Sequence, residues 1–163
     1  MADHAVTAGP IAGAGLIVLA LAGGVGWLGY RDHQIQHAQE QRESYVQVAR
    51  QAAINLTTIS YAQADADVQR IVDSTTGEFR DDFSQRSRPF VDVVKQAQSE
   101  SEGTVTEAGL ESVDGNRADV LLAVSVRTTI AGTAQPEPRY WRMRISLQRI
   151  GDGPKVSNIA FVQ

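Results

Sequence analysis

No charged side chain occurs between Gly9 and Tyr30, and this apolar stretch limits the possible folds of the chain more than any other feature. About 20 helical residues span the ~30 Å hydrocarbon core of a bilayer, so the stretch has the length of a membrane span. Trp27 and Tyr30 close it as interfacial aromatic residues do, and Arg31 follows at once. The sequence therefore predicts one transmembrane helix over residues 9–30, after a short tail of residues 1–8. The expected anchor residues are Leu16, Ile17, Val18, Leu19, Leu21, Val25, Trp27, Leu28 and Tyr30.

Two other interpretations of this stretch fit less well. Ala20-Leu21-Ala22 before Gly23 resembles a signal-peptidase site, but no Lys or Arg precedes the apolar run as in a signal peptide. A buried helix of a soluble domain would be shorter and would carry charges. Small residues also recur four apart, which either lets two helices approach closely or arises by chance in a Gly/Ala-rich segment. The candidate helix–helix contact positions are Gly9, Gly13, Ala20 and Gly24, followed by Ile35 and Ala38 in the stalk.

The charges beside the stretch favour one orientation only weakly. Arg31 and Arg42 follow it, whereas only the terminal amine precedes it, so the positive-inside rule favours a cytoplasmic C-terminal domain. Asp32, Glu40 and Glu43 lie among these arginines and reduce the contrast.

Three helices are expected after the span. Residues 34–60 contain no Gly or Pro, and their apolar positions follow an alternating three-four spacing that is typical of one helical stripe. From Tyr45 onward the stripe is expected to pack on its own domain. Between Ile35 and Arg42 it packs either there or on another membrane-proximal helix. Residues 31–44 are therefore interpreted as a juxtamembrane stalk, and residues 45–163 as the domain.

A second, short helix is expected with Asp65 as its N-cap and Gly77 as the residue that ends it. A third is expected from Glu78 to Glu100, kinked or divided at Pro89 because proline breaks the helical hydrogen-bond pattern. The side chains of this third helix expected to point inward are Phe79, Phe83, Phe90, Val91, Val94 and Ala97.

After Gly103 the apolar period changes from that of a helix to that of a strand. Residues 104–113 are β-like, and Asp114-Gly115-Asn116 is typical of a hairpin turn. Two segments alternate apolar and polar residues, from Ala118 to Val126 and from Trp141 to Leu147. A loop over residues 131–138 separates them, and a last strand over residues 155–162 follows the turn at Gly151-Asp152-Gly153. The sequence therefore predicts an α+β fold, with three helices before an antiparallel four-stranded meander.

The composition excludes several classes of chemistry. A net charge of -4 and a pI of about 5.3 disfavour a nucleic-acid partner. There is no cysteine, and His4, His33 and His37 all precede the domain, which leaves it neither thiol nor imidazole for catalysis. Tyr61, Tyr140 and Asp65 are the set that would suit a proton-transfer site, but nothing in their spacing brings them together. His33 and His37 stand four apart without a third metal ligand. We therefore expect no enzyme, catalytic residue, metal or cofactor.

Arginines concentrate in the strand region, and Arg142 and Arg144 share one face of their strand. They are interpreted either as an ordinary solvated face flanked by carboxylates or as a surface for an acidic partner or for lipid headgroups.

Several segments resemble one known family. They are the membrane span, Ala49-Arg50-Gln51-Ala52-Ala53-Ile54-Asn55-Leu56-Thr57-Thr58-Ile59, Asp65-Ala66-Asp67-Val68-Gln69-Arg70-Ile71, Ser74-Thr75-Thr76-Gly77-Glu78-Phe79-Arg80-Asp81-Asp82-Phe83, and Trp141-Arg142-Met143-Arg144 with Val156-Ser157-Asn158. Together they resemble the Mce-associated membrane proteins of actinobacteria, which accompany the Mce (mammalian cell entry) lipid-import systems. The resemblance extends from the anchor to the C-terminus, and its motifs are structural rather than catalytic.

The resemblance implies a cystatin-like or NTF2-like cone-shaped domain. It also implies a single-pass protein of the plasma (inner) membrane with a cytoplasmic N-terminus and a periplasmic or otherwise extracytoplasmic domain. We follow it on orientation because the charge contrast is small. The expected function is a non-enzymatic accessory subunit of an Mce-type importer, whose partners are Mce proteins and their permease. Two alternatives stay open: a lipid carrier that uses the cone, and a scaffold of another envelope machine such as a type IV secretion system.

Overall fold

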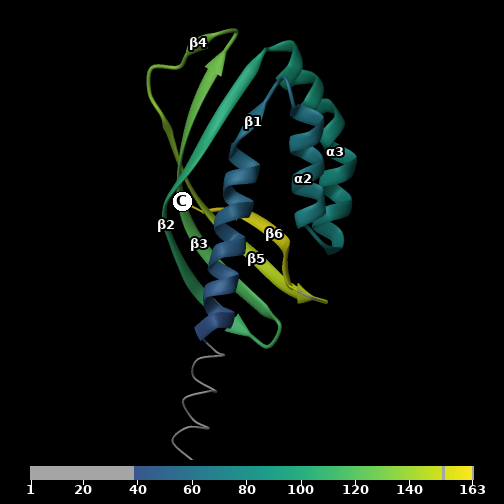
Figure 1. The fold of residues 1–163 in the computed structure, drawn as a ribbon, viewed down its shortest axis with the longest axis vertical. Coiled ribbons are helices and arrows are strands. Elements are labelled where there is room, and N and C mark those ends of the chain that lie inside the picture. Colours follow the sequence, from purple (N-terminus) through teal and green to yellow (C-terminus); the bar gives the residue numbers. More distant parts are fainter. Residues whose placement is uncertain (1–38, 152, 163) are drawn as a thin grey trace, which may run out of the picture. The chain divides into compact units, whose positions relative to one another are not determined.

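The computed structural model describes residues 39–151 and 153–162, and its compact domain begins at Arg42. Residues 39–57 are helical, and this segment is called helix 39–57 below. The other helices are α2 (Ala64–Ser74) and α3 (Gly77–Gln96). The strands are β1 (Ile59–Ser60), β2 (Ser99–Asp114), β3 (Arg117–Ile130), β4 (Thr133–Ala134), β5 (Arg139–Ile150) and β6 (Gly153–Phe161). The order of three helices before a meander is as predicted (Figure 1).

The strands form one antiparallel sheet in the order β1-β2-β3-β5-β6, with β4 paired to the end of β3. Asp114 pairs with Arg117, so Gly115 and Asn116 form a two-residue hairpin turn. Gly115 has a φ of 57°, a conformation that glycine adopts at little cost. The predicted hairpin turn is therefore confirmed.

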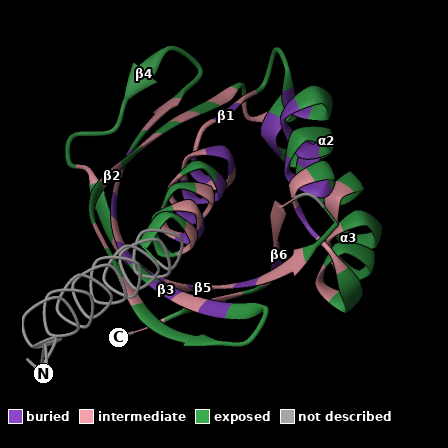
Figure 2. Cartoon of the chain, turned by 60° about the horizontal axis from the view of Figure 1, so that its bottom comes forward, coloured by how far each residue is buried: buried purple, intermediate pink, exposed green. Residues whose placement is uncertain are grey.

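The sheet curls around helix 39–57, and α2 and α3 lie as a pair beside it (Figure 2). Alternate residues of β3 and β5 face this helix and form most of the core, as their period-2 pattern predicts. The buried residues of the two strands are Ala118, Val120, Leu122, Val124, Val126, Met143, Ile145 and Leu147. Tyr45, Ala49, Ala52 and Ala53 of the helix pack against them, which confirms that the stripe from Tyr45 onward serves its own domain.

A second apolar cluster joins α2 and α3 to β1. Here one prediction is wrong: Phe90 is 44% exposed, because α3 buries only the stripe that contains Val91 and Val94. Phe90 precedes Val91 by one residue and therefore points about 100° away around the helix. Phe79 and Phe83 are half-buried and stack on each other, with their ring centroids 6.1 Å apart.

Several expected boundaries also differ. Asp65 is not the N-cap of α2: Gln63 holds that position, and Asp65 lies in the first turn, where it pairs with Lys95. Gly77 opens α3 rather than closing α2, and its φ of 62° makes the turn between the two helices. Pro89 lies inside α3, which continues through it as one helix. The strands β1 and β4 were not predicted, because two residues carry no periodic signal.

None of the helices in the described part of the chain is long and apolar enough to cross a bilayer. The predicted span with its anchor residues lies outside the described residues, and so do the candidate helix–helix contacts at Gly9, Gly13, Ala20, Gly24, Ile35 and Ala38.

Candidate functional site

The concave side of the sheet is filled by helix 39–57. Tyr45, Ala49 and Ala53 are fully buried against β3 and β5, and the small alanine side chains let the helix approach the sheet closely. The side chain of Arg149 stacks on the Tyr45 ring, with Cζ 5.5 Å from the ring centroid. Such a contact shields the guanidinium face and holds the end of β5 against the helix. The centre of the curl is therefore packed protein.

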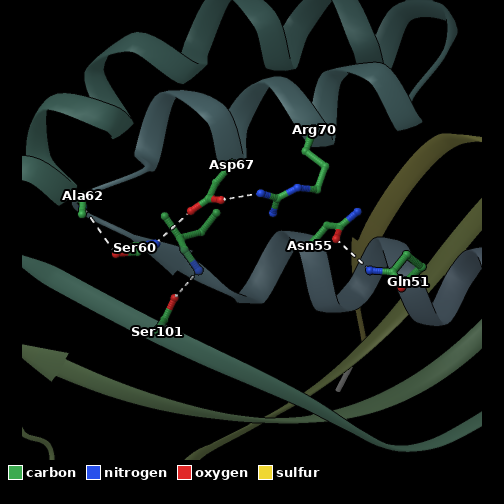
Figure 3. Close-up of polar contacts among 8 residues, drawn as sticks. Gln51, Asn55, Ser60, Ala62, Asp67, Arg70 and Ser101 are labelled. Atoms are coloured by element: carbon green, nitrogen blue, oxygen red, sulfur yellow. Dashed lines mark hydrogen bonds and ion pairs between the residues drawn. The ribbon is translucent and has the colours of Figure 1, made fainter.

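An open groove of about 820 Å³ lies at one end of the domain, between β1, α2 and the ends of β2 and β3. Asp67 of α2, only 5% exposed, contributes to its wall. One carboxylate oxygen of Asp67 accepts a hydrogen bond from the Ser60 backbone N–H at 3.0 Å, and the other accepts one from Arg70 at 2.9 Å (Figure 3). Asp67 thus fastens the short strand β1 to α2, a structural use of a buried carboxylate.

The rest of this groove combines polar and charged residues of both signs with apolar ones, which are Ile59, Ala134, Pro136 and Pro138. Hydroxyl groups of Thr58, Ser101 and Thr128 line it, together with Glu100 and Arg127. Next to it, β2 crosses the end of helix 39–57 at Gly103, whose N–H donates to the Thr58 hydroxyl at 3.1 Å. A Cβ added to Gly103 would come within 1.7 Å of the Thr57 Oγ1, so glycine is required at this crossing.

The three residues considered for proton transfer do not come together. Tyr140 lies on β5 and is 75% exposed, and Tyr61 lies in the turn after β1. Asp65 on α2 pairs with Lys95 of α3, and this ammonium lowers the pKa of the Asp65 carboxyl. Within residues 39–151 and 153–162, no group of three His, Asp or Glu side chains is placed to hold a metal ion.

The outer face of the sheet carries the arginines that the sequence singled out. Arg144 makes a two-pronged ion pair with Glu111 of β2: its Nε lies 2.5 Å from one carboxylate oxygen and an Nη 2.7 Å from the other. This contact raises the pKa of the Arg144 guanidinium. Asp119 lies on the same face and accepts two hydrogen bonds, from the Ser112 hydroxyl at 3.1 Å and from the Ser146 hydroxyl at 2.6 Å.

Arg142 lies on the same face and differs from Arg144. It is exposed and makes no ion pair with any residue in the described part of the chain. It lines two adjoining hollows of about 510 and 470 Å³, which it shares with Ala123 and Val162. Glu107 lines the second hollow. The sequence did not indicate Glu107 or Glu111, because bulges after Val105 and Leu110 interrupt the period of β2 and hide which residues face outward.

Residues 6–163 match the model of a family described as Uncharacterized protein Rv1363c/MT1408-like. The chain belongs to this family. Rv1363c itself, a protein of Mycobacterium tuberculosis strain H37Rv, is 36% identical to this chain over 152 residues. The match covers 93% of the chain and 58% of Rv1363c, so the chain spans little more than half of its relative's length.

Solved structures share the fold of this family member. An IcmL-like type IV secretion system protein from Legionella pneumophila superposes with a TM-score of 0.63 at 15% identity, over 74% of this chain and 91% of that protein. The periplasmic domain of DotI superposes with a TM-score of 0.61 at 18% identity, over 74% of this chain and 94% of that domain. At these identities the likeness shows the shared fold alone.

Proposed function

We propose that this chain is a scaffold subunit, without enzymatic activity, of a multi-protein assembly of the cell envelope. The observation that carries the proposal is the filled concave side of the sheet, where Tyr45, Ala49 and Ala53 occupy the centre of the curl. A fold whose interior is packed protein offers its outer surfaces for recognition. Two structural neighbours support the proposal by their names: one is a type IV secretion system protein, and the other is a periplasmic domain.

A lipid carrier is the less favoured function. An acyl chain or sterol needs a mostly apolar chamber that encloses most of its surface. The groove of about 820 Å³ is open instead, and charged or hydroxyl-bearing side chains such as Asp67, Arg70 and Ser101 line it. A lipid that copurifies with the domain in stoichiometric amount, detected by mass spectrometry, would reverse this preference.

The assembly that the scaffold serves is proposed on two different grounds. The resemblance to Mce-associated proteins indicates a lipid-import system with its Mce proteins and permease. The shared fold with the IcmL-like protein and DotI supports the alternative, a secretion machine, and the solved structures give no such support to a lipid importer. We further propose that residues 9–30 anchor the chain in the inner membrane and that the domain lies outside the cytoplasm.

The first experiment is an affinity purification of the full-length protein from native membranes in mild detergent, with every copurifying protein identified. A scaffold is expected to recover several subunits of one assembly, in ratios that repeat between preparations. Mce proteins with a permease would identify a lipid importer, and secretion subunits would identify the alternative. Recovery of this protein alone would contradict the scaffold function.

A further inference from the structure

Two rows of residues cross the outer face of the sheet from β2 to β5, each with a glutamate at one end and an arginine at the other. In one row, called closed, the two charged side chains form an ion pair; in the other, called open, they do not. In the closed row Glu111 of β2 reaches over β3 to Arg144 of β5. In the open row Glu107 pairs in register with Ala123, and Ala123 pairs in register with Arg142. Neither Glu107 nor Arg142 makes a hydrogen bond or ion pair through its side chain to any residue that the structure describes.

The open row stands beside a furrow, formed by the two hollows that meet at Ala123 and Arg142. Small residues of adjacent strands, Gly109 and Ala123, form its floor, and Leu121 adds an exposed apolar surface. Tyr140 extends the furrow at the end nearest β4. A shallow apolar floor with one free charge at each side is suited to a bound chain segment.

Building on the proposed scaffold function, we infer that this furrow docks a segment of a partner protein with an acidic side chain for Arg142 and a basic side chain for Glu107. The backbones that carry the two charges lie two strand spacings apart, about 9–10 Å. A free carboxylate or phosphate ion satisfies one of the two charges, whereas two side chains of a protein segment satisfy both. A membrane surface recognises clusters of cations, and Glu107 opposes such binding.

The ion pair in the closed row explains why a partner would bind the open row instead. Arg144 and Glu111 already satisfy each other, so a partner would have to break their ion pair before binding either group. Arg142 and Glu107 require no such step, because their charges face solvent. Complementary charges of this kind fix the register and the choice of partner more than they add affinity.

The test uses photo-crosslinking of the full-length protein in native membranes. A photoreactive amino acid replaces Tyr140 in the furrow and, as a matched control, Phe90, which is also exposed but lies on α3. The crosslinked peptide is then sequenced by mass spectrometry. The expected product at position 140 is a peptide of one partner protein with an acidic and a basic residue near the crosslink, which position 90 does not capture.

A second experiment reverses the charge of Arg142 and measures the crosslinking yield at position 140. Arg142→Glu is expected to lower the crosslinking yield by about tenfold or more, because like charges then face each other. Reversal of the partner's acidic residue to Arg should restore the yield. Arg88→Glu, at an exposed arginine of α3, makes the same change of net charge and should leave the yield unchanged. Thermal unfolding of both variants at the wild-type temperature establishes that neither change acts through the fold.

Each other outcome overturns the inference. If affinity purification recovers partners but Arg142→Glu crosslinks as the wild type does, the furrow is not the docking site and the scaffold function stands. A crosslink to a lipid, or to a second copy of this chain, replaces the proposed occupant. If neither crosslinking nor purification recovers any partner, the scaffold function fails and the docking site fails with it.

Discussion

Gly103 lies where β2 passes the end of helix 39–57, and it illustrates how single residues determine this fold. We expect Gly103→Ala to destabilise the domain by about 1–3 kcal/mol, the usual cost of overpacking. The added Cβ would meet the Thr57 Oγ1 at 1.7 Å, and that hydroxyl is held by a 2.6 Å hydrogen bond to the Ala53 carbonyl. Gly109→Ala is the matched control on the same strand, because nothing lies within 4 Å of its added Cβ. Denaturant unfolding of both variants measures the difference, and equal stabilities would contradict the packing argument.

A second effect of a single residue is that Lys95 of α3 lowers the pKa of the Asp65 carboxyl on α2. The pair lowers the pKa of Asp65 in the folded state, so its stabilising effect is present above the unfolded pKa of this carboxyl. The effect is lost as the pH falls through the lower, folded value. We expect Lys95→Ala to raise the titration midpoint of Asp65 toward the ordinary aspartate value, as followed by carboxyl NMR. Arg86→Ala, which removes a cation elsewhere on α3, should leave that midpoint unchanged; a midpoint that stays low in Lys95→Ala would exclude Lys95 as the cause.

At the scale of elements, β1 is a strand of two residues that depends on a side chain from α2. Asp67 accepts the Ser60 N–H, so Asp67→Ala leaves that donor without its partner and should cost about 1–3 kcal/mol. Asp67→Asn retains an oxygen acceptor and should cost less. Hydrogen exchange at Ser60 should accelerate in the alanine variant. Asp73→Ala, which removes an exposed carboxylate from the same helix, serves as control. Unchanged exchange at Ser60 in Asp67→Ala would show that this bond does not hold β1.

Sequence periodicity predicted those elements whose two faces differ in environment. β3 and β5 are buried on one face and solvated on the other, so the apolar positions of the predicted alternation, such as Val120, Leu122 and Ile145, coincide with the buried ones. Where both faces are similar, the signal fails. α3 is exposed over most of its surface, so little in its sequence separates the narrow buried stripe from its neighbours, and Phe90 was wrongly expected in the core. The start of β2 at Ser99 is polar and was assigned to the preceding helix.

The candidate site was predicted only in part, for a related reason. Arg142 and Arg144 were identified together because they are two residues apart and therefore share one face of β5. Nothing in the sequence distinguished between them. Their difference depends on Glu111 and Glu107, which β-bulges in β2 place on the outer face. Register across strands is a tertiary property, so no pattern within β5 distinguishes the paired arginine from the free one.

At the scale of the whole molecule, the proposed scaffold function depends on which side of the membrane the domain occupies. The chain contains no cysteine, so one introduced thiol reports its own location. We expect Gln85→Cys, at an exposed position of α3, to react with a membrane-impermeant maleimide in intact cells. Ala2→Cys, before the predicted span, should react only after lysis.

The opposite labelling pattern would agree with the weak preference of Arg31 and Arg42 for the cytoplasm. It would then remove the ground for an extracytoplasmic assembly, because the furrow at Arg142 would meet only cytoplasmic partners. Labelling of both positions in intact cells would mean that residues 9–30 do not span the membrane, since both thiols would lie on one side. The docking experiment depends on this result, because it decides in which compartment the partner of Arg142 and Glu107 must be sought.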